Sequence, residues 1–143
     1  MINLSEDYVI KIEGKQNADE DENTVSLSTR GRFYHKNGNY YIVYKETEVT
    51  GYEGSTTTVK VEGEQKVSML RHGEYASTMV VEKGKRHSSQ YETGEGSLML
   101  GVSAIAIKNK LTPRGGEISF SYDLDINSVD VSTNHIKITV REV

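Results

Sequence analysis

Apolar and polar residues alternate with a period of two along most of the chain, and no apolar stripe with the 3.6-residue period of a helix is sustained. Residues 118–126 give the clearest case, because isoleucine, phenylalanine, tyrosine and leucine alternate there with serine and aspartate. Successive side chains of a strand point to opposite faces, so this pattern predicts strands with one buried face. Asp123 and Asp125 are accordingly expected on the outer face. The whole chain is predicted to form roughly nine or ten strands joined by turns.

Turn residues fix the register of two predicted hairpins. Asn37-Gly38 favours a two-residue type I′ turn, because both residue types tolerate a positive φ. A three-residue loop at 63–65 aligns the apolar faces of the strands that flank it, whereas a two-residue loop would mismatch every pair. Gly31 is expected to leave room for the ring of Tyr44. The predicted partners are Thr29 with Glu46, Gly31 with Tyr44, Phe33 with Ile42, Thr57 with Arg71, Val59 with Met69 and Val61 with Val67.

Three segments depart from clean alternation. Residues 16–23 contain consecutive acidic residues that repel one another, so we predict an exposed loop rather than a calcium site, whose spaced ligand pattern is missing. Residues 98–107 are apolar on both faces and predict a strand bent at Gly101, with Ile105 inside beyond the bend. A further hairpin is predicted around Gly84, and its register stays open because consecutive apolar residues precede the turn.

Many short strands without a helix of useful length satisfy their edges most simply by curling into a barrel. We therefore predict an all-β fold, a closed or nearly closed antiparallel meander β-barrel, with a β-sandwich as the alternative. At 143 residues the chain is predicted to form one domain, residues 1–143, with a single core. Barrels of this kind either fill their interior with side chains or keep a cavity for a small ligand. Nine tyrosines against two phenylalanines favour a partly polar interior, although tyrosine is also common in strands generally.

Composition and charge narrow the classes of function. The formal net charge of -4 opposes binding to a phosphate backbone, so no nucleic-acid partner is expected. The chain has no cysteine, which excludes disulfides and thiolate chemistry and favours a cytoplasmic location. No segment is long and apolar enough to cross a bilayer as a helix, and residues 1–6 carry no basic region followed by an apolar stretch. Neither membrane association nor secretion is therefore predicted.

Two charged residues fall on predicted inward faces. Glu46 shares a face with Tyr44 at the end of an apolar strand, and Arg71 shares a face with Met69. Isolated charge inside a protein is costly and needs a partner or a ligand. These two residues therefore predict either a binding cavity or an internal bridge between Glu46 and Arg71 that fixes strand register without a ligand.

A series of short motifs runs along the chain. They are Tyr40–Thr47, Thr56–Lys60, Arg71–Glu74, Met79 with Gly84, Tyr91–Thr93, Gly115–Glu117 and Tyr122–Leu124. In order and spacing these motifs resemble the YwiB-like bacterial proteins, a family whose biochemical function is not established. The resemblance spans nearly the whole chain and implies a calycin fold, the antiparallel barrel of lipocalins and fatty-acid-binding proteins. Lys45 and Val81 depart from the family pattern, and the glycine-x-tryptophan signature of secreted lipocalins is absent.

The first functional hypothesis is a non-enzymatic barrel that binds a small anionic or amphipathic ligand. Arg71 would grip the anionic group with two parallel hydrogen bonds, and Glu46 would orient Arg71 or receive a polar group of the ligand. Tyr44 and Tyr91 would donate hydrogen bonds from their hydroxyls. The resemblance adds Thr93 to this set of ligand-binding residues.

The alternatives are an assembly module and an enzyme. In the first, an open barrel edge or the strand at 98–107 joins a second copy as a homodimer, and Glu46 with Arg71 is only structural. No catalytic residue, metal site or cofactor is predicted, because the four histidines are scattered without ligand spacing and no phosphate-binding loop is present. A buried Glu46 acting as a base, in a hydrolase or an isomerase, is the remaining enzymatic alternative.

Overall fold

The computed structural model describes residues 7–49, 52–73, 76–93 and 96–143, and the side chains of residues 90–93 lie outside this description. The described residues form ten strands in one sheet, in the order β6-β5-β4-β3-β2-β1-β10-β9-β8-β7. The strands are β1 (Tyr8–Ala18), β2 (Asp21–Lys36), β3 (Asn39–Lys45), β4 (Thr56–Glu62), β5 (Lys66–His72), β6 (Ser77–Glu82), β7 (Arg86–Thr93), β8 (Gly96–Thr112), β9 (Gly115–Ile126) and β10 (Val129–Glu142). Every neighbouring pair is antiparallel, which confirms the all-β prediction.

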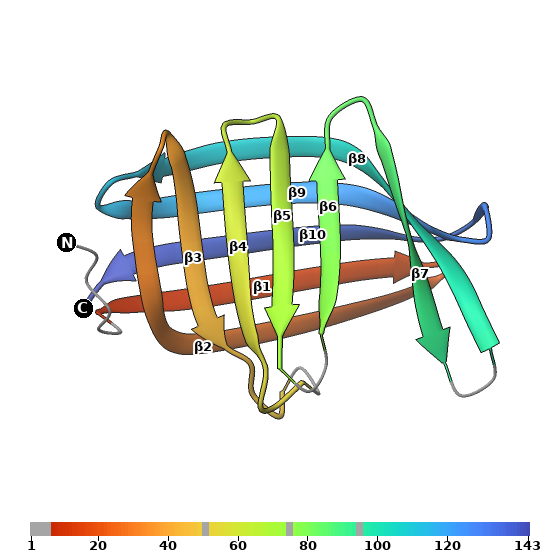
Figure 1. The fold of residues 1–143 in the computed structure, drawn as a ribbon, viewed down its shortest axis with the longest axis horizontal. Helices are drawn as coiled ribbons and strands as arrows, with labels where there is room; N and C mark the ends of the chain where they lie inside the picture. The colour runs from red at the N-terminus through yellow and green to blue at the C-terminus, as the bar shows by residue number, and fades with distance from the viewer. Residues whose placement is uncertain (1–6, 50–51, 74–75, 94–95) are drawn as a thin grey trace.

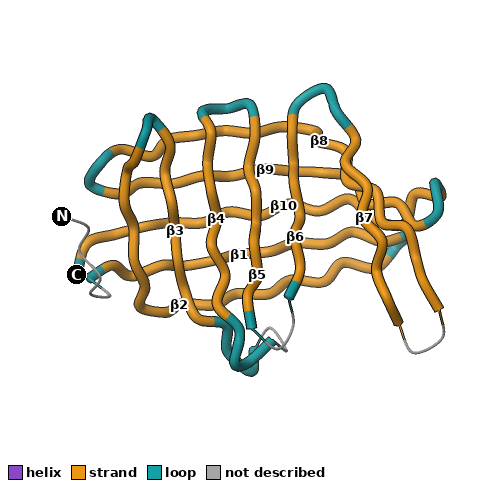
Figure 2. The backbone as a smooth tube through the Cα atoms, viewed as in Figure 1, coloured by secondary structure: helices purple, strands orange, loops and turns teal. Residues whose placement is uncertain are grey.

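The sheet curls into a nearly closed barrel, as predicted. Figure 1 shows the shorter strands β3 to β6 crossing in front of the longer strands β8, β9, β10 and β1, and Figure 2 shows the turns that connect them. The strand alternation read from the sequence turns one face inward, where the apolar side chains gather in one cluster. Its fully buried members are Ile10, Ile42, Val59, Val61, Val67, Val81, Ile118, Phe120 and Ile138.

Aromatic rings pack together in one region of this interior. The Phe33 ring lies 5.4 Å from that of Tyr8 and 5.6 Å from that of Tyr40, measured between ring centroids. These offset and edge contacts are among the favoured geometries for buried rings. They fill the space beside β1, β2 and β3, so the room that is left inside the barrel lies elsewhere.

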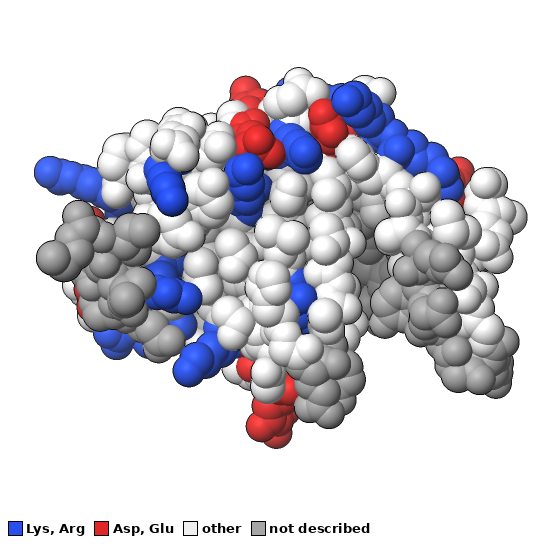
Figure 3. Space-filling view, in the orientation of Figure 1, with Lys and Arg blue, Asp and Glu red and all other residues white. Residues whose placement is uncertain are grey.

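The barrel lacks one ladder, between β6 and β7. These strands are consecutive in the chain, yet they are the two edges of the described sheet. The amide of Lys83 donates to the carbonyl of Gln65 in the neighbouring turn, at 2.9 Å, and side chains connect the edges through Glu82 Oε1 and His87 Nε2, 2.8 Å apart. The hairpin predicted around Gly84 is thus a turn without a ladder. We call this place the β6–β7 seam, and Figure 3 shows the surface recessed there.

The two hairpin registers are confirmed apart from one pair. The Asn37-Gly38 turn has positive φ at both residues, +53° and +82°, as a type I′ turn requires. The ladders pair the predicted partners from Gly31 with Tyr44 to Thr57 with Arg71. The exception is Thr29 with Glu46: β3 ends at Lys45, and the Glu46 amide instead donates to the Ser55 carbonyl at 2.8 Å. This backbone bond turns the chain at the start of the connection to β4.

The acidic segment is a hairpin tip, so the loop prediction for residues 16–23 is wrong. The ladder between β1 and β2 continues through Asn17 opposite Glu22 to Ala18 opposite Asp21. The carboxylates are exposed, and Lys15 Nζ lies 3.4 Å from Glu22 Oε2. Solvent and this neighbouring cation reduce the repulsion that favoured a loop.

The irregularity in β8 lies further along the strand than predicted. The register shifts between Ala104 and Ala106, and Ile105 is 53% exposed in this bulge. Val102 and Ile107 are buried on either side of it, so the predicted change of inward phase is present. A bulge adds one residue to one strand, and that extra residue is Ile105 rather than a residue at Gly101.

Candidate functional site

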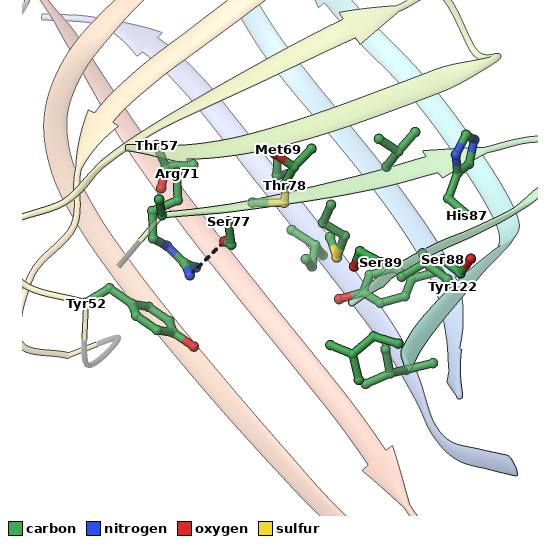
Figure 4. Close-up of a pocket in the computed structure, with 17 residues that line it drawn as sticks. Tyr52, Thr57, Met69, Arg71, Ser77, Thr78, His87, Ser88, Ser89 and Tyr122 are labelled. Carbon is green, nitrogen blue, oxygen red and sulfur yellow. Dashed lines mark hydrogen bonds between the residues drawn. The ribbon is translucent and has the colours of Figure 1, made fainter. Parts of the chain in front are cut away.

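A cavity of about 530 Å³ opens inside the barrel beside the β6–β7 seam. It lies between β4, β5 and β6 on one side and β7, β8, β9 and β10 on the other. Figure 4 shows polar side chains toward two ends of this main cavity, with methionines and aliphatic side chains between them. The apolar lining residues are Met69, Ala76, Met79, Val80, Leu100, Val102, Leu124 and Ile136.

Arg71 occupies one end of the main cavity. Its guanidinium carbon lies 3.5 Å from the centroid of the Tyr52 ring, and Nη1 donates to Ser77 Oγ at 3.2 Å. A guanidinium has five N–H donors. The Arg71 Nε atom is fully buried and has no hydrogen-bond partner among the described residues. The side chain is thus held in place by stacking while part of its donor capacity is unused.

Glu46 lies close to this end, but its carboxylate is hydrogen-bonded within the protein. Its side chain is buried, and Oε1 accepts a hydrogen bond from Thr57 Oγ1 at 2.6 Å. Within the described residues no direct ion pair joins Glu46 to Arg71; the Arg71 guanidinium contacts Tyr52 and Ser77 instead. The register brings Thr57 opposite both Tyr44 and Arg71, so these groups share one rung of the barrel wall.

Tyr44 lies in the same rung, opposite Thr57, and is buried. Burial raises the pKa of its phenol, and the nearby negative charge of Glu46 raises it further. Tyr44 therefore stays protonated at physiological pH. Because Tyr44 is not among the residues that line the main cavity, the structure places it in the wall rather than at the surface a ligand would touch.

The other two predicted site residues are only partly described. Tyr91 and Thr93 lie in β7, where their backbones pair with Leu98 and Gly96 of β8. Their side chains lie outside the described residues, and their role stays a prediction. Several polar residues that line the cavity were not predicted as site residues from the sequence, among them Tyr52, Ser77, Ser89 and Tyr122. Two of these lie outside strands or at a strand's first residue, where alternation gives no signal.

The charge of the cavity is one-sided. Apart from the titratable His87, Arg71 is the only charged side chain among the described residues that line it, and no aspartate or glutamate does. Apolar walls strengthen the field of such a charge, because they keep the local dielectric low. The geometry therefore suits a molecule with an anionic group and an apolar body.

An ion pair lies across the outer face of β8. Arg86 Nε and Nη2 donate to the two carboxylate oxygens of Asp125, at 2.9 and 2.6 Å. The pair passes directly over Gly101, where an added Cβ would lie 2.3 Å from atoms of both side chains. Asp125 is on the outer face, yet it is only 5% exposed because this bidentate pair covers it. Asp125 thus lies on the outer face as predicted, but its side chain is covered rather than exposed to solvent.

Asp125→Asn is expected to make folding less sensitive to acid. The hydrogen bonds from Arg86, its positive charge and the Ser128 amide hold the pKa of Asp125 below its ordinary value. A carboxyl whose folded-state pKa is lowered stabilises the fold above its unfolded value of about 4, and this contribution is lost as pH falls through the folded value. Urea midpoints at pH 6 and pH 3 should therefore fall less in Asp125→Asn than in the wild type. An exposed control, Asp130→Asn, should keep the wild-type fall; equal falls in all three proteins would contradict the assignment.

Two further arrangements of the described residues bear on other kinds of chemistry. No three side chains of the kind that bind metals gather closely enough to hold an ion among them. Ser121 Oγ and His135 Nδ1 are 2.6 Å apart on the outer face, but His135 has no acid partner among the contacts described there. This pair thus lacks the orienting third group of a hydrolytic triad. No helix in the described ranges is long and apolar enough to cross a membrane.

The described strands define a nearly closed antiparallel β-barrel. Comparison with family models places the chain further: it belongs to the family described as Domain of unknown function (DUF1934), whose model matches residues 10–138. The chain is similar in structure to the ywiB protein from Bacillus subtilis, with a TM-score of 0.81 and 23% sequence identity over 95% of this chain and 91% of that one. A search of curated proteins found no match. The resemblance to the YwiB-like family that the sequence indicated is confirmed. Neither the family description nor the name of the similar structure states an activity.

Proposed function

We propose that this protein is a non-enzymatic binding barrel for a small amphipathic anion, held in the main cavity by Arg71. The observation that carries the proposal is the Arg71 side chain at one end of the cavity, in a lining that contains no aspartate or glutamate among the described residues. A carboxylate or a phosphate would supply acceptors to the guanidinium. The volume of about 530 Å³ lies within the usual range for small-molecule sites.

The Tyr52 stack and the Ser77 hydrogen bond support this role. Both contacts orient the guanidinium plane before any ligand arrives, so little side-chain entropy would be lost on binding. Thr57 donates a hydrogen bond to the Glu46 carboxylate, and no direct ion pair joins Glu46 to Arg71 among the described residues. The cation thus remains available to a ligand while Glu46 balances its charge from within the wall.

Arg71→Met is expected to weaken ligand binding by about 10- to 100-fold, because it removes a charge-assisted hydrogen bond but keeps most of the side chain's bulk. Wild-type protein purified from its own host should show a discrete added mass by native mass spectrometry that disappears on denaturation. The Arg71→Met protein should lack it. Arg114→Met, at an exposed turn position, is the matched control and should keep it. An adduct of equal occupancy in all three proteins would remove Arg71 from the site.

A second candidate function is assembly, in which the outer surface of the barrel binds a second copy of the chain. It is favoured by the exposed apolar side chains of Met99, Ile105, Val129 and Val131 and by the two unpaired strand edges of the described sheet. Exposed edges and apolar patches are common features of interaction sites. The same native spectra test it, because a dimer without an added mass would favour assembly over ligand binding.

A further inference from the structure

We propose that the ligand of the main cavity carries a second, neutral hydrogen-bonding group at the end remote from its charge, and that Tyr122 binds this group. This inference rests on the proposed function, because it concerns the same cavity. It goes further by naming the class of ligand: an anionic group, an apolar middle and a hydroxyl, amide or carbonyl group.

Tyr122 is placed for this role by β9. The inward alternation puts its ring between Phe120 and Leu124 on the buried face, and only 8% of the residue is exposed. Figure 4 shows the phenol reaching into the main cavity, well away from Arg71 and Tyr52. The barrel thus presents polar groups to the cavity from two separate places.

The Tyr122 hydroxyl has no hydrogen-bond partner among the described residues, although the residue is more than nine-tenths buried. Asn134 faces Tyr122 across the ladder, but its amide nitrogen donates to Ser132 Oγ at 3.0 Å. Burying a hydroxyl without a partner costs free energy, so such a group is usually satisfied by water or a ligand. Tyr122 lines the cavity, so a molecule held there can approach its hydroxyl.

Burial also keeps the Tyr122 hydroxyl protonated. It raises the pKa of the phenol to about 12, so the hydroxyl keeps its proton and can donate as well as accept. Ser89 of β7, which lies opposite Leu100, adds another polar residue to the lining. The lining between Tyr122 and Arg71 is supplied by apolar side chains such as Met69, Met79 and Leu124. A ligand that matches this lining is polar at both ends and apolar between them.

The test uses alkyl carboxylates of six to twelve carbons, each with and without a terminal hydroxyl, titrated by calorimetry into the full-length protein. At the chain length that spans the cavity, the hydroxylated form should bind the wild type about fivefold more tightly than the plain form, the size of one neutral hydrogen bond. Tyr122→Phe should remove that preference while leaving the plain form's affinity unchanged. Arg71→Met should weaken both forms and keep the preference. Tyr34→Phe, a tyrosine on the outer face of β2, is the matched control and should behave as wild type.

The outcomes separate the two proposals. Equal affinities for the two forms at every length, or a preference that persists in Tyr122→Phe, would overturn the second polar subsite while an effect of Arg71→Met keeps the anion site. No binding of any probe to the wild type would overturn both for this class of ligand. Circular dichroism and the Tm of Tyr122→Phe should match the wild type, because the lost hydroxyl has no partner in the described protein.

Discussion

Gly31→Ala is expected to destabilise the protein by about 3 kcal/mol, the upper part of the usual range for overpacking a buried site. A Cβ at Gly31 would lie 2.4 Å from the backbone oxygen of Val43 and 2.3 Å from Ile10 Cδ1. The isoleucine can move, but the oxygen belongs to the ladder between β2 and β3 and cannot yield without breaking it. Gly31 therefore makes room for the neighbouring backbone and for Ile10, more than for the ring of Tyr44.

Urea denaturation measures this effect directly, since the midpoint falls with the free energy of unfolding. Gly14→Ala is the matched control, because Gly14 lies in the same pair of strands and an added Cβ there meets nothing within 4 Å. Its midpoint should stay at or slightly above that of the wild type, as alanine costs less chain entropy than glycine. Similar midpoints for the two variants would show that contact at Gly31 is not the limiting factor.

Gly101→Ala is expected to destabilise the protein by about 2 kcal/mol and to loosen β7. The new methyl group would occupy the space through which Arg86 reaches Asp125, at 2.3 Å from both side chains. The bidentate pair would have to separate, leaving a covered carboxylate without its cation. Because His87, Ser88 and Ser89 of β7 line the main cavity, ligand binding should weaken together with stability.

A mutant cycle tests the cause. In a background that carries both Arg86→Ala and Asp125→Ala, the obstruction is gone, and Gly101→Ala should cost much less than in the wild type. Ser103→Ala, on the same strand face, adds no atoms and controls for changes in β8 itself. If the cost of Gly101→Ala is the same in both backgrounds, the charged pair is not what the glycine accommodates.

The strands and hairpin registers were predictable because each depends on a local pattern. Alternation turns Ile118, Phe120 and Tyr122 inward, and the Asn37-Gly38 turn sets a register that the ladder confirms. The missing ladder at the β6–β7 seam was not predictable, since it depends on how far the whole sheet curls before its edges meet. The irregularity in β8 was predicted at Gly101 instead of Ile105 because residues that are apolar on both faces do not show which residue is the extra one.

The site was predictable in part. Inward alternation identified Arg71 as a cavity residue, and the structure lines the main cavity with it. The contacts of Arg71 with Tyr52 and Ser77 come from a connection and from another strand, so no sequence pattern joins them. The bidentate pair of Arg86 and Asp125 was missed because three strands must align before its residues meet over Gly101.

The ladder between β1 and β10 has a consequence for how the chain is made. It is the pairing that joins the sheet β6 to β1 to the sheet β10 to β7, and its partners run from Tyr8 opposite Glu142 to Asn17 opposite Thr133. On the ribosome, β1 through β9 emerge before the strand that completes them, so the two halves stay separate until translation reaches β10. Closing so long a loop is entropically costly and slow. During that interval β1 and β9 each present a bare strand edge to other chains, and the pairing of β10 covers both of these edges.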